Sequence, residues 1–398
     1  MFHLLAQQAN LVILLNIKEA FIIKNILIVE PFFSGSHKTW AEQYKKYSSH
    51  NIEILSMDGR FWKWRMYGGA VTLAKEFLTS NFNPDIILAT DMLDLTTFIS
   101  LIRKKLKTSV PIGVYFHENQ LTYPWKTDSE DKHLKRDINY GFMNYTTALA
   151  ADHVFFNSKH NMNSFYNALE ILLKKMPDYK HSNITEILYK KSEVLPIGMN
   201  LKKINKGDKD IYKEDLPLIL WNHRWEFDKN PDDFFKALFI LKKEGLKFKL
   251  AILGQAYKNS PPIFEKAFEI FKEDIIKTGY LSGTEYASWL LASDILPVTS
   301  NHDFFGISVM EAVYSRCYPI LPKRLTYPDL YTIDKHPEIF YENFIDLVDK
   351  LRFAIVNINE IRRKNYSQIA QKYDWSKIID YYDEKIGNLT INNDGHQI

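Results

Sequence analysis

The stretch His302–Ala312, HDFFGISVMEA, decides how we expect the chain to fold. It follows an apolar run, Asp294–Val298, that is typical of a buried strand, and Tyr318–Leu321 beyond it has the same character. A strand, a turn with Gly306 and the start of a helix form a geometry that can hold an anion. The first helical turn has unpaired N–H groups and the positive end of the helix dipole.

Two acidic residues of this stretch, Asp303 and Glu311, are separated so that one can lie in the loop and the other in the helix, both facing a crevice. One interpretation is a nucleotide site, with backbone amides on phosphate and Glu311 on ribose hydroxyls. The other is an ordinary loop–helix junction with a solvated glutamate. The spacing alone favours neither.

Apolar runs of strand length recur along the chain, with helical patterns such as Leu93–Leu106 and His160–Lys174 between them. The other runs are Asn25–Val29, Ile52–Leu55, Pro84–Ala89, Pro111–Phe116, His153–Phe156, Val194–Ile197, Leu218–Trp221, Phe248–Gly254 and Ile276–Leu281. Such alternation predicts an α/β fold with parallel sheets and right-handed crossovers. A ligand crevice is then expected at the carboxyl ends of the strands.

The 398 residues are long enough for two domains, and the charged stretch 201–215 is the natural linker between them. We expect an N-terminal extension (1–23), a first Rossmann-like domain (24–200), a second one (201–375) and a closing helix with a tail (376–398).

The composition, with 46% hydrophobic and 25% charged residues, is that of a globular protein. A net charge of +3 neither requires nor excludes a nucleic-acid partner, because a local patch matters more. The single cysteine, Cys317, precedes an apolar run and is expected to be buried, which fits a cytoplasmic location. The apolar run Leu11–Leu15 is too short to span a bilayer, so we expect no membrane association.

Two cations, Arg224 and Lys229, follow the strand Leu218–Trp221. Both could reach a diphosphate, Arg through its planar fork and Lys as a compact charge. An isolated pair of this kind is more often solvated. Their place at a strand end is compatible with phosphate binding.

His117 and Glu118 follow another strand, but Leu121 occupies the position where a zinc protease has its second histidine. No sequence spacing therefore indicates a metal. A lone histidine after a strand is more often a structural residue than a ligand.

Cations and aromatic residues alternate over Asp58–Gly69. This pattern suits phosphate pairing together with base stacking. The alternative is a loop whose tryptophans fill a hydrophobic gap while its cations are solvated. A second glycine-bearing turn, Ser34–His37, opens a helix and is another candidate anion site.

The spacing of Asp303 and Glu311 resembles the two-acid signature of retaining GT-B glycosyltransferases, although the first acid is usually Glu. Three further stretches, Glu30–His37, Gly59–Met66 and Tyr115–Leu121, resemble the tRNA-queuosine alpha-mannosyltransferase family. The resemblance covers roughly residues 24–385. It implies a GT-B enzyme that transfers mannose from GDP-mannose to queuosine in a tRNA anticodon, without a metal.

The resemblance also implies roles for particular residues. The catalytic group comprises His117, Arg224, Lys229 and Glu311. The donor site comprises Ser34, Gly35, Arg224, Lys229, Asp303, Phe305, Gly306, Ile307 and Glu311. The acceptor side comprises Ser36, His37, Arg60, Trp62, Lys63, Trp64, Arg65, Glu118 and Asn119. The alternatives are a glycosyltransferase with a lipid or polysaccharide acceptor, and a non-catalytic nucleotide-sugar or RNA-binding protein.

Overall fold

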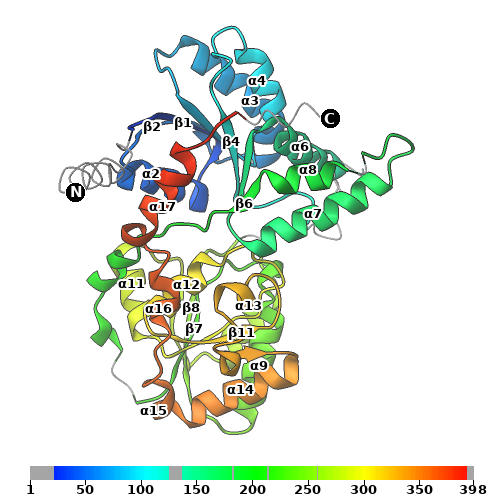
Figure 1. Ribbon diagram of the computed structural model, residues 1–398. Helices are drawn as coiled ribbons and strands as arrows, with labels where there is room; N and C mark the ends of the chain where they lie inside the picture. Colours follow the sequence, from blue (N-terminus) through cyan, green and yellow to red (C-terminus); the bar gives the residue numbers. More distant parts are fainter. Residues whose placement is uncertain (1–21, 125–136, 182, 213–214, 258, 392–398) are drawn as a thin grey trace, which may run out of the picture.

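The computed structural model describes residues 22–124, 137–181, 183–212, 215–257 and 259–391, and it has two α/β halves stacked on one another (Figure 1). Each half is built on a six-stranded sheet whose paired strands are all parallel. The predicted α/β class is confirmed. The predicted extension 1–23 lies outside the described residues except for its last two.

The first sheet has the strand order β2-β1-β3-β4-β5-β6. Its strands are β1 (Asn25–Phe33), β2 (Asn51–Asp58), β3 (Ile86–Thr90), β4 (Ile112–Phe116), β5 (His153–Phe156) and β6 (Ser192–Val194). Its helices are α2 (Gly35–Tyr47), α3 (Trp62–Thr79), α4 (Leu95–Ile102), α6 (Asp137–Ala150), α7 (Lys159–Lys174) and α8 (Ile184–Lys190). Alternate β1 side chains pack on opposite faces, Ile26 and Ile28 in the cluster with α2, and Leu27 and Val29 in the cluster with α3 and α4.

The second sheet has the order β12-β11-β10-β7-β8-β9. Its strands are β7 (Leu218–Trp221), β8 (Lys249–Leu253), β9 (Ile275–Gly279), β10 (Ile295–Pro297), β11 (Tyr318–Pro322) and β12 (Phe340–Tyr341). Its helices are α9 (Pro231–Lys243), α10 (Ile263–Ile270), α11 (Gly283–Ala292), α12 (Ile307–Tyr314), α13 (Tyr327–Leu330), α14 (Phe344–Val356), α15 (Ile358–Ile361) and α16 (Ser367–Gln371). The two-residue β12 is too short to show a sequence pattern.

The segment between the two sheets, predicted as a linker, forms two short 3₁₀ helices, η1 (Leu201–Lys206) and η2 (Lys209–Ile211). They pack on α11, where the backbone N–H of Asp208 donates to Oγ of Ser288 at 2.7 Å. The segment is therefore held against the second half. The predicted domain boundaries remain a prediction.

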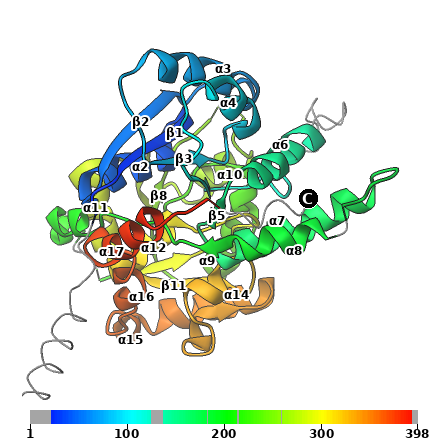
Figure 2. The ribbon, with the colours of Figure 1, turned by 45° about the horizontal axis from the view of Figure 1, so that its top comes forward.

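The last helix, α17 (Trp375–Gly387), returns to the first half and lies beside α2 (Figures 1 and 2). Nε1 of Trp40 donates to the Tyr382 hydroxyl at 3.2 Å, and Nε1 of Trp375 donates to Oε1 of Gln43 at 2.7 Å. These aromatic side chains hold α17 against α2 of the first half. None of the described helices is both long and apolar enough to cross a bilayer.

Candidate active site

A cavity of about 280 Å³ lies between the two halves, at the carboxyl ends of strands from both sheets. This is where doubly wound folds place their ligands. From the first half it is lined by Ser36, His37, His117, Glu118, Tyr123, Asn157 and Ile197. From the second half it is lined by Asn222, His223, Arg224, Asp228, Lys229, His302, Asp303, Phe304, Phe305, Gly306, Ile307 and Ser308.

A buried carboxylate, Glu30, stands behind the wall that the first half contributes. It lies on β1 with no exposed surface, and its Oε1 accepts a hydrogen bond from the Phe32 backbone N–H at 2.8 Å. Its Oε2 pairs with Nδ1 of His37 at 2.9 Å. The ring of His117 lies against that of His37, with centroids 4.2 Å apart. Glu30 thus holds one of two neighbouring imidazoles at the cavity.

The two histidines have different charges because of this arrangement. Burial alone would lower the pKa of His37, but the charge of Glu30 and its hydrogen bond outweigh burial and raise that pKa to about 9. Burial, and then the positive charge of His37, hold the pKa of His117 well below its usual range. At neutral pH His37 is an imidazolium and His117 is neutral. Neither nitrogen of His117 has a hydrogen-bond partner among the described residues.

Ligand atoms of Glu30, His37 and His117 all lie within 4.8 Å of one another, which sequence spacing could not show. Such a group could hold a metal ion. Here, however, both Glu30 oxygens already accept hydrogen bonds, and the two imidazole rings pack against each other at an angle of 37°. Glu30 and His37 therefore form a charge pair, and the neutral ring of His117 packs beside it.

The two predicted residues that follow His117, Glu118 and Asn119, differ in where their side chains lie. Glu118 lines the cavity and accepts a hydrogen bond from Nε2 of Gln120 at 2.9 Å. Asn119 is fully buried, its Nδ2 donates to Oδ1 of Asn161 at 2.8 Å, and its Oδ1 accepts from the Thr122 backbone N–H. The side chain of Asn119 thus supports the loop and is not brought to the cavity.

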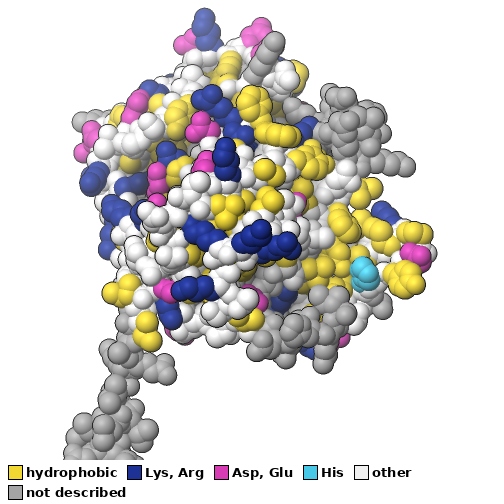
Figure 3. Space-filling model, turned by 90° about the horizontal axis from the view of Figure 1, so that it is seen from above, with side chains coloured by type: hydrophobic (Ala, Val, Ile, Leu, Met, Phe, Trp, Pro, Cys, Tyr) yellow, Lys and Arg dark blue, Asp and Glu magenta, His cyan; other side chains and the backbone are white. Residues whose placement is uncertain are grey.

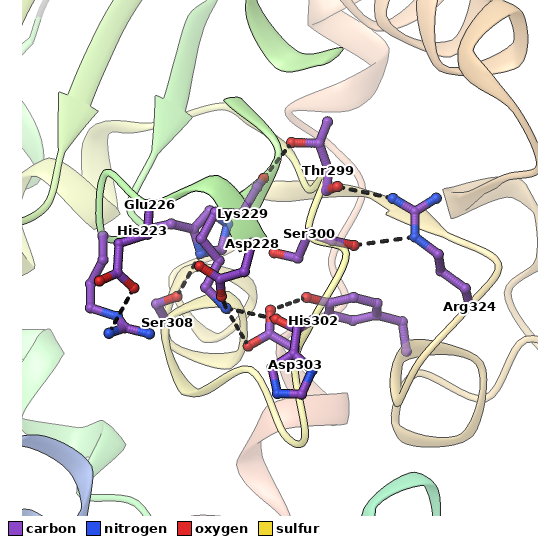
Figure 4. Close-up of polar contacts among 12 residues, drawn as sticks. His223, Glu226, Asp228, Lys229, Thr299, Ser300, His302, Asp303, Ser308 and Arg324 are labelled. Atoms are coloured by element: carbon purple, nitrogen blue, oxygen red, sulfur yellow. Dashed lines mark hydrogen bonds and ion pairs between the residues drawn. The ribbon is translucent and has the colours of Figure 1, made fainter. Parts of the chain in front are cut away.

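The second half presents Lys229 next to Asp228 and Asp303 (Figure 4). Lys229 is only 8% exposed. Its Nζ donates to the His302 carbonyl at 2.8 Å and to Oδ1 of Asp303 at 3.1 Å, and it lies 3.2 Å from Oδ2 of Asp228. Oδ2 of Asp303 also accepts from the Tyr327 hydroxyl at 2.6 Å. Burial would raise the pKa of Asp303, but Lys229 leads the groups that lower it to about 2. Asp303 is ionised and positions Lys229 within the cavity wall.

Arg224 is the more accessible cation. Its side chain is half-exposed and pairs with Oε2 of Glu226 at 2.8 Å. One pair of this kind leaves most of the guanidinium's donors for a ligand.

The turn before α12 supplies backbone to the cavity. Gly306 has a φ of +82°, a left-handed conformation that L side chains rarely adopt. Oγ of Ser308 in the first turn lies 3.2 Å from Nδ1 of His223. Arg324 supports the preceding loop by donating to the carbonyls of Thr299 and Ser300 (Figure 4). The turn lines the cavity through the three residues predicted for the donor site, Phe305, Gly306 and Ile307.

Glu311 lies on α12, beyond the described residues that line the cavity. Its Oε2 accepts from the Tyr286 hydroxyl at 3.1 Å, and Lys203 lies 3.5 Å from its Oε1. Burial and the charge of Glu311 hold the pKa of Tyr286 well above its usual range, so this phenol stays protonated as a donor. Glu311 is thus a fixed carboxylate.

The stretch Arg60–Arg65 is the start of a helix rather than a loop, because α3 begins at Trp62. Trp62 packs against Tyr140 with ring centroids 5.2 Å apart, whereas Trp64 is 63% exposed. One tryptophan fills a hydrophobic gap and the other faces solvent. Neither these residues nor Ser34 and Gly35 line the cavity, although Ser36 and His37 do.

Sequence reasoning missed several residues of the site. Asn222 and His223 directly follow β7, and His302 lies in the loop between β10 and α12. Their positions after strands could have indicated that they belong to the site. Glu30 and Tyr123 gave no such signal. Glu30 lies within β1, and only the packing of His37 shows its purpose.

Comparisons with known proteins place the two halves in separate groups. Residues 25–199 match the family described as tRNA-queuosine alpha-mannosyltransferase N-terminal, and residues 203–373 match glycosyl transferases group 1. A tRNA-queuosine alpha-mannosyltransferase from Drosophila melanogaster is 33% identical over 362 residues, covering 89% of this chain and 92% of that relative.

Solved structures show the same architecture at low identity. Sucrose-phosphate synthase from Thermosynechococcus elongatus has a TM-score of 0.67 at 11% identity, covering 92% of this chain and 99% of its own. HepE from Anabaena, in complex with UDP and glucose, has a TM-score of 0.62 at 14% identity, covering 92% and 100%. This likeness concerns the fold alone, and it confirms the predicted GT-B architecture.

Proposed function

Because the chain belongs to the tRNA-queuosine alpha-mannosyltransferase family, we propose that it transfers mannose from GDP-mannose to queuosine in a tRNA anticodon. The chain is a glycosyltransferase. The observation that best supports the proposal is the composition of one cavity. Arg224 and Lys229 from the second half line it together with His37 and His117 from the first.

In this proposal the donor diphosphate lies against Arg224 and Lys229. The bond between the anomeric carbon and the diphosphate oxygen breaks, and a bond to the queuosine hydroxyl forms on the same face. The hydroxyl proton passes to the departing diphosphate. Fixed cations stabilise the charge that develops on that group, which is the main contribution to catalysis. Lys229 already uses its N–H groups, so phosphate would replace one of its present partners.

Backbone groups and further side chains complete the donor site. The N–H groups of Phe305, Gly306 and Ile307 face phosphate, aided by the positive end of α12. Ser34 and Gly35 flank the donor at the start of α2, and Glu311 holds ribose hydroxyls. Neutral His117 has free nitrogens and binds the mannose, with Glu118 beside it.

The acceptor approaches from the first half. Ser36 and His37 line the cavity where the queuosine hydroxyl would enter. Arg60, Trp62, Lys63, Trp64 and Arg65 face the surrounding RNA. A tRNA substrate also favours the cytoplasm as the place of action.

A panel of nucleotide sugars tests the donor. With queuosine-bearing tRNA, we expect nucleotide release from GDP-mannose to exceed release from GDP-glucose and UDP-glucose by at least tenfold, which a difference of about 1.4 kcal/mol in transition-state binding provides. Equal use of UDP-glucose would overturn the proposed donor.

Glu311→Gln tests the ribose contact. We expect GDP and GDP-mannose to bind roughly 10- to 100-fold more weakly, because a hydrogen bond to a charged group contributes about 1.5–3 kcal/mol. The loss should appear mainly in KM, since substrate and transition state share the contact. Tyr286→Phe is the matched variant, because it removes the donor that positions Glu311. Calorimetry showing unchanged GDP affinity in Glu311→Gln would exclude this role.

We also propose that transfer needs no metal ion. Activity should therefore survive treatment with EDTA, assayed by nucleotide release. Complete loss with EDTA and recovery with a divalent ion would contradict this expectation, and would direct attention to Glu30, His37 and His117.

A further inference from the structure

One side of α3 presents a row of large hydrophobic side chains to solvent. Trp64, Tyr67, Val71 and Leu78 follow one another at helical spacings and are all exposed. Figure 3 views the molecule from the end where α3 lies in Figure 1, and hydrophobic and basic side chains are intermixed on that face. An exposed row of this kind indicates an interaction surface.

The first side chain of the row, Trp64, has a seat on the helix. A Cβ atom at Gly68 would lie 2.8 Å from Cζ2 and 2.9 Å from Cε2 of Trp64. The indole therefore rests directly on the backbone of Gly68, and only a residue without a side chain leaves room for it. One part of the ring is held by the helix while most of its surface stays open. Such a ring is prepared for stacking.

Cations surround this end of the helix. Arg60 and Lys63 are exposed, and Nε of Arg65 donates to the Asp58 carbonyl at 3.0 Å. The positive end of the helix dipole adds to their charge. Phe61, at the N-cap, is 77% exposed and has a φ of +52°, a left-handed conformation that is strained for a bulky residue. Positive charge next to open aromatic rings complements an unpaired nucleotide.

The segment that leads into α3 lies next to the turn that lines the cavity. Gly59 touches the turn that leads to Ser36 and His37, because a Cβ atom at Gly59 would lie 2.0 Å from Cβ of Ser34. On the other side of the turn, the ring of Phe32 lies 6.0 Å from that of His37 and belongs to the same small hydrophobic cluster as Trp62. A polymer with one residue in the cavity can therefore extend across the start of α3.

We propose that Trp64, seated on Gly68, is a stacking platform for an unpaired base of the acceptor RNA next to the nucleotide that enters the cavity. The proposal rests on the proposed function and adds the surface that holds the RNA outside the cavity. The cations and the continuity with the cavity favour RNA over a protein partner as the occupant.

Four variants test the platform, with a queuosine-bearing anticodon stem-loop RNA as the probe and fluorescence anisotropy as the measurement. Gly68→Ala and Trp64→Ala should each weaken binding by roughly 5- to 100-fold, the range found for loss of one stacked base. The double variant should bind no more weakly than Trp64→Ala, because both changes remove the same contact. Thr72→Ala, an exposed position of the same helix, is the matched control and should bind normally.

Gly68→Ala separates a binding role from a structural one. Alanine is a better helix former than glycine, and the exposed indole can move aside, so the Tm should not fall. A variant that folds as well as the wild type but binds RNA more weakly is expected only if the contact between Trp64 and Gly68 contributes to RNA binding. Lys63→Ala should lower the slope of log K against log salt by about 1, whereas Trp64→Ala should leave that slope unchanged.

Unchanged RNA affinity in both Gly68→Ala and Trp64→Ala, with binding and transfer by the wild type intact, would overturn the platform alone. A wild type that neither binds the stem-loop nor transfers sugar to it would overturn the proposed function as well. Sedimentation that shows a dimer of the wild type, a monomer of Trp64→Ala and equal RNA affinity would assign the row to self-association and overturn the proposal.

Discussion

Replacing Arg224 or Lys229 by alanine should lower kcat by about 100-fold or more, because each change removes a fixed cation from the departing diphosphate. The two variants should differ in stability. The side chain of Arg224 is half-exposed and its pair with Glu226 contributes little to folding. Loss of Lys229 leaves buried Asp228 and partly buried Asp303 without their cation, at a cost of about 3–5 kcal/mol. Steady-state kinetics and thermal unfolding measure the two effects.

A control variant and a dependence of stability on pH accompany this prediction. Arg352 lies on α14 and pairs with Glu244 at 2.8 Å. The variant Arg352→Ala should leave kcat unchanged. The pKa of Asp303 is depressed to about 2, so the stability from its pair with Lys229 is present above the usual aspartate range and is lost as pH falls towards 2. The variant Lys229→Ala should lack this acid-dependent contribution to the free energy of unfolding. Near-normal turnover in both Arg224→Ala and Lys229→Ala would refute the phosphate assignment.

Glu30→Gln should remove the positive charge of His37 at neutral pH. In the wild type the raised pKa of His37 contributes stability that is complete below pH 6.5 and is lost as pH rises through about 9. A shift from 6.5 to about 9 corresponds to about 3 kcal/mol. The variant should lack this pH dependence, because burial then dominates and lowers the pKa of the ring. We expect kcat to fall roughly 10- to 100-fold near pH 7, since a charged hydrogen-bond donor leaves the cavity.

Imidazole NMR signals and unfolding measured from pH 6 to 10 test this prediction. Glu53→Gln is the matched control, because Glu53 is an exposed carboxylate on β2 that pairs with Lys45. A wild-type His37 that titrates near its ordinary pKa, or one whose titration does not respond to Glu30→Gln, would refute the charge pair.

The sequence predicted the architecture well because strands buried on both faces contain continuous apolar runs, as in Ile26–Val29 and Ile86–Ala89. The family suggested by three short motifs is confirmed by similarity over most of the chain. Short elements were harder. Strand β6 spans Ser192–Val194, so it begins two residues before the predicted run Val194–Ile197 and shares only Val194 with it. The strand is partly polar and only half-buried, which hides it from an apolar pattern.

The site was predicted in part. Positions directly after strands, such as His117 and Arg224, could be found because parallel strands direct their carboxyl ends to one crevice. The side chains that contact these residues could not be predicted from the sequence. Glu30 meets His37, and Tyr327 meets Asp303, only through tertiary packing that no spacing records. For the same reason the sequence could not distinguish packed Trp62 from exposed Trp64.

The most direct test of the proposed function is mass analysis of nucleosides from queuosine-bearing tRNA that has been incubated with the protein and GDP-mannose. Transfer predicts that the queuosine peak gains the mass of one hexose, that tRNA without queuosine is unchanged, and that Arg224→Ala forms far less product. Consumption of GDP-mannose with no change in the mass of queuosine would contradict transfer to tRNA, and would favour a lipid or polysaccharide acceptor.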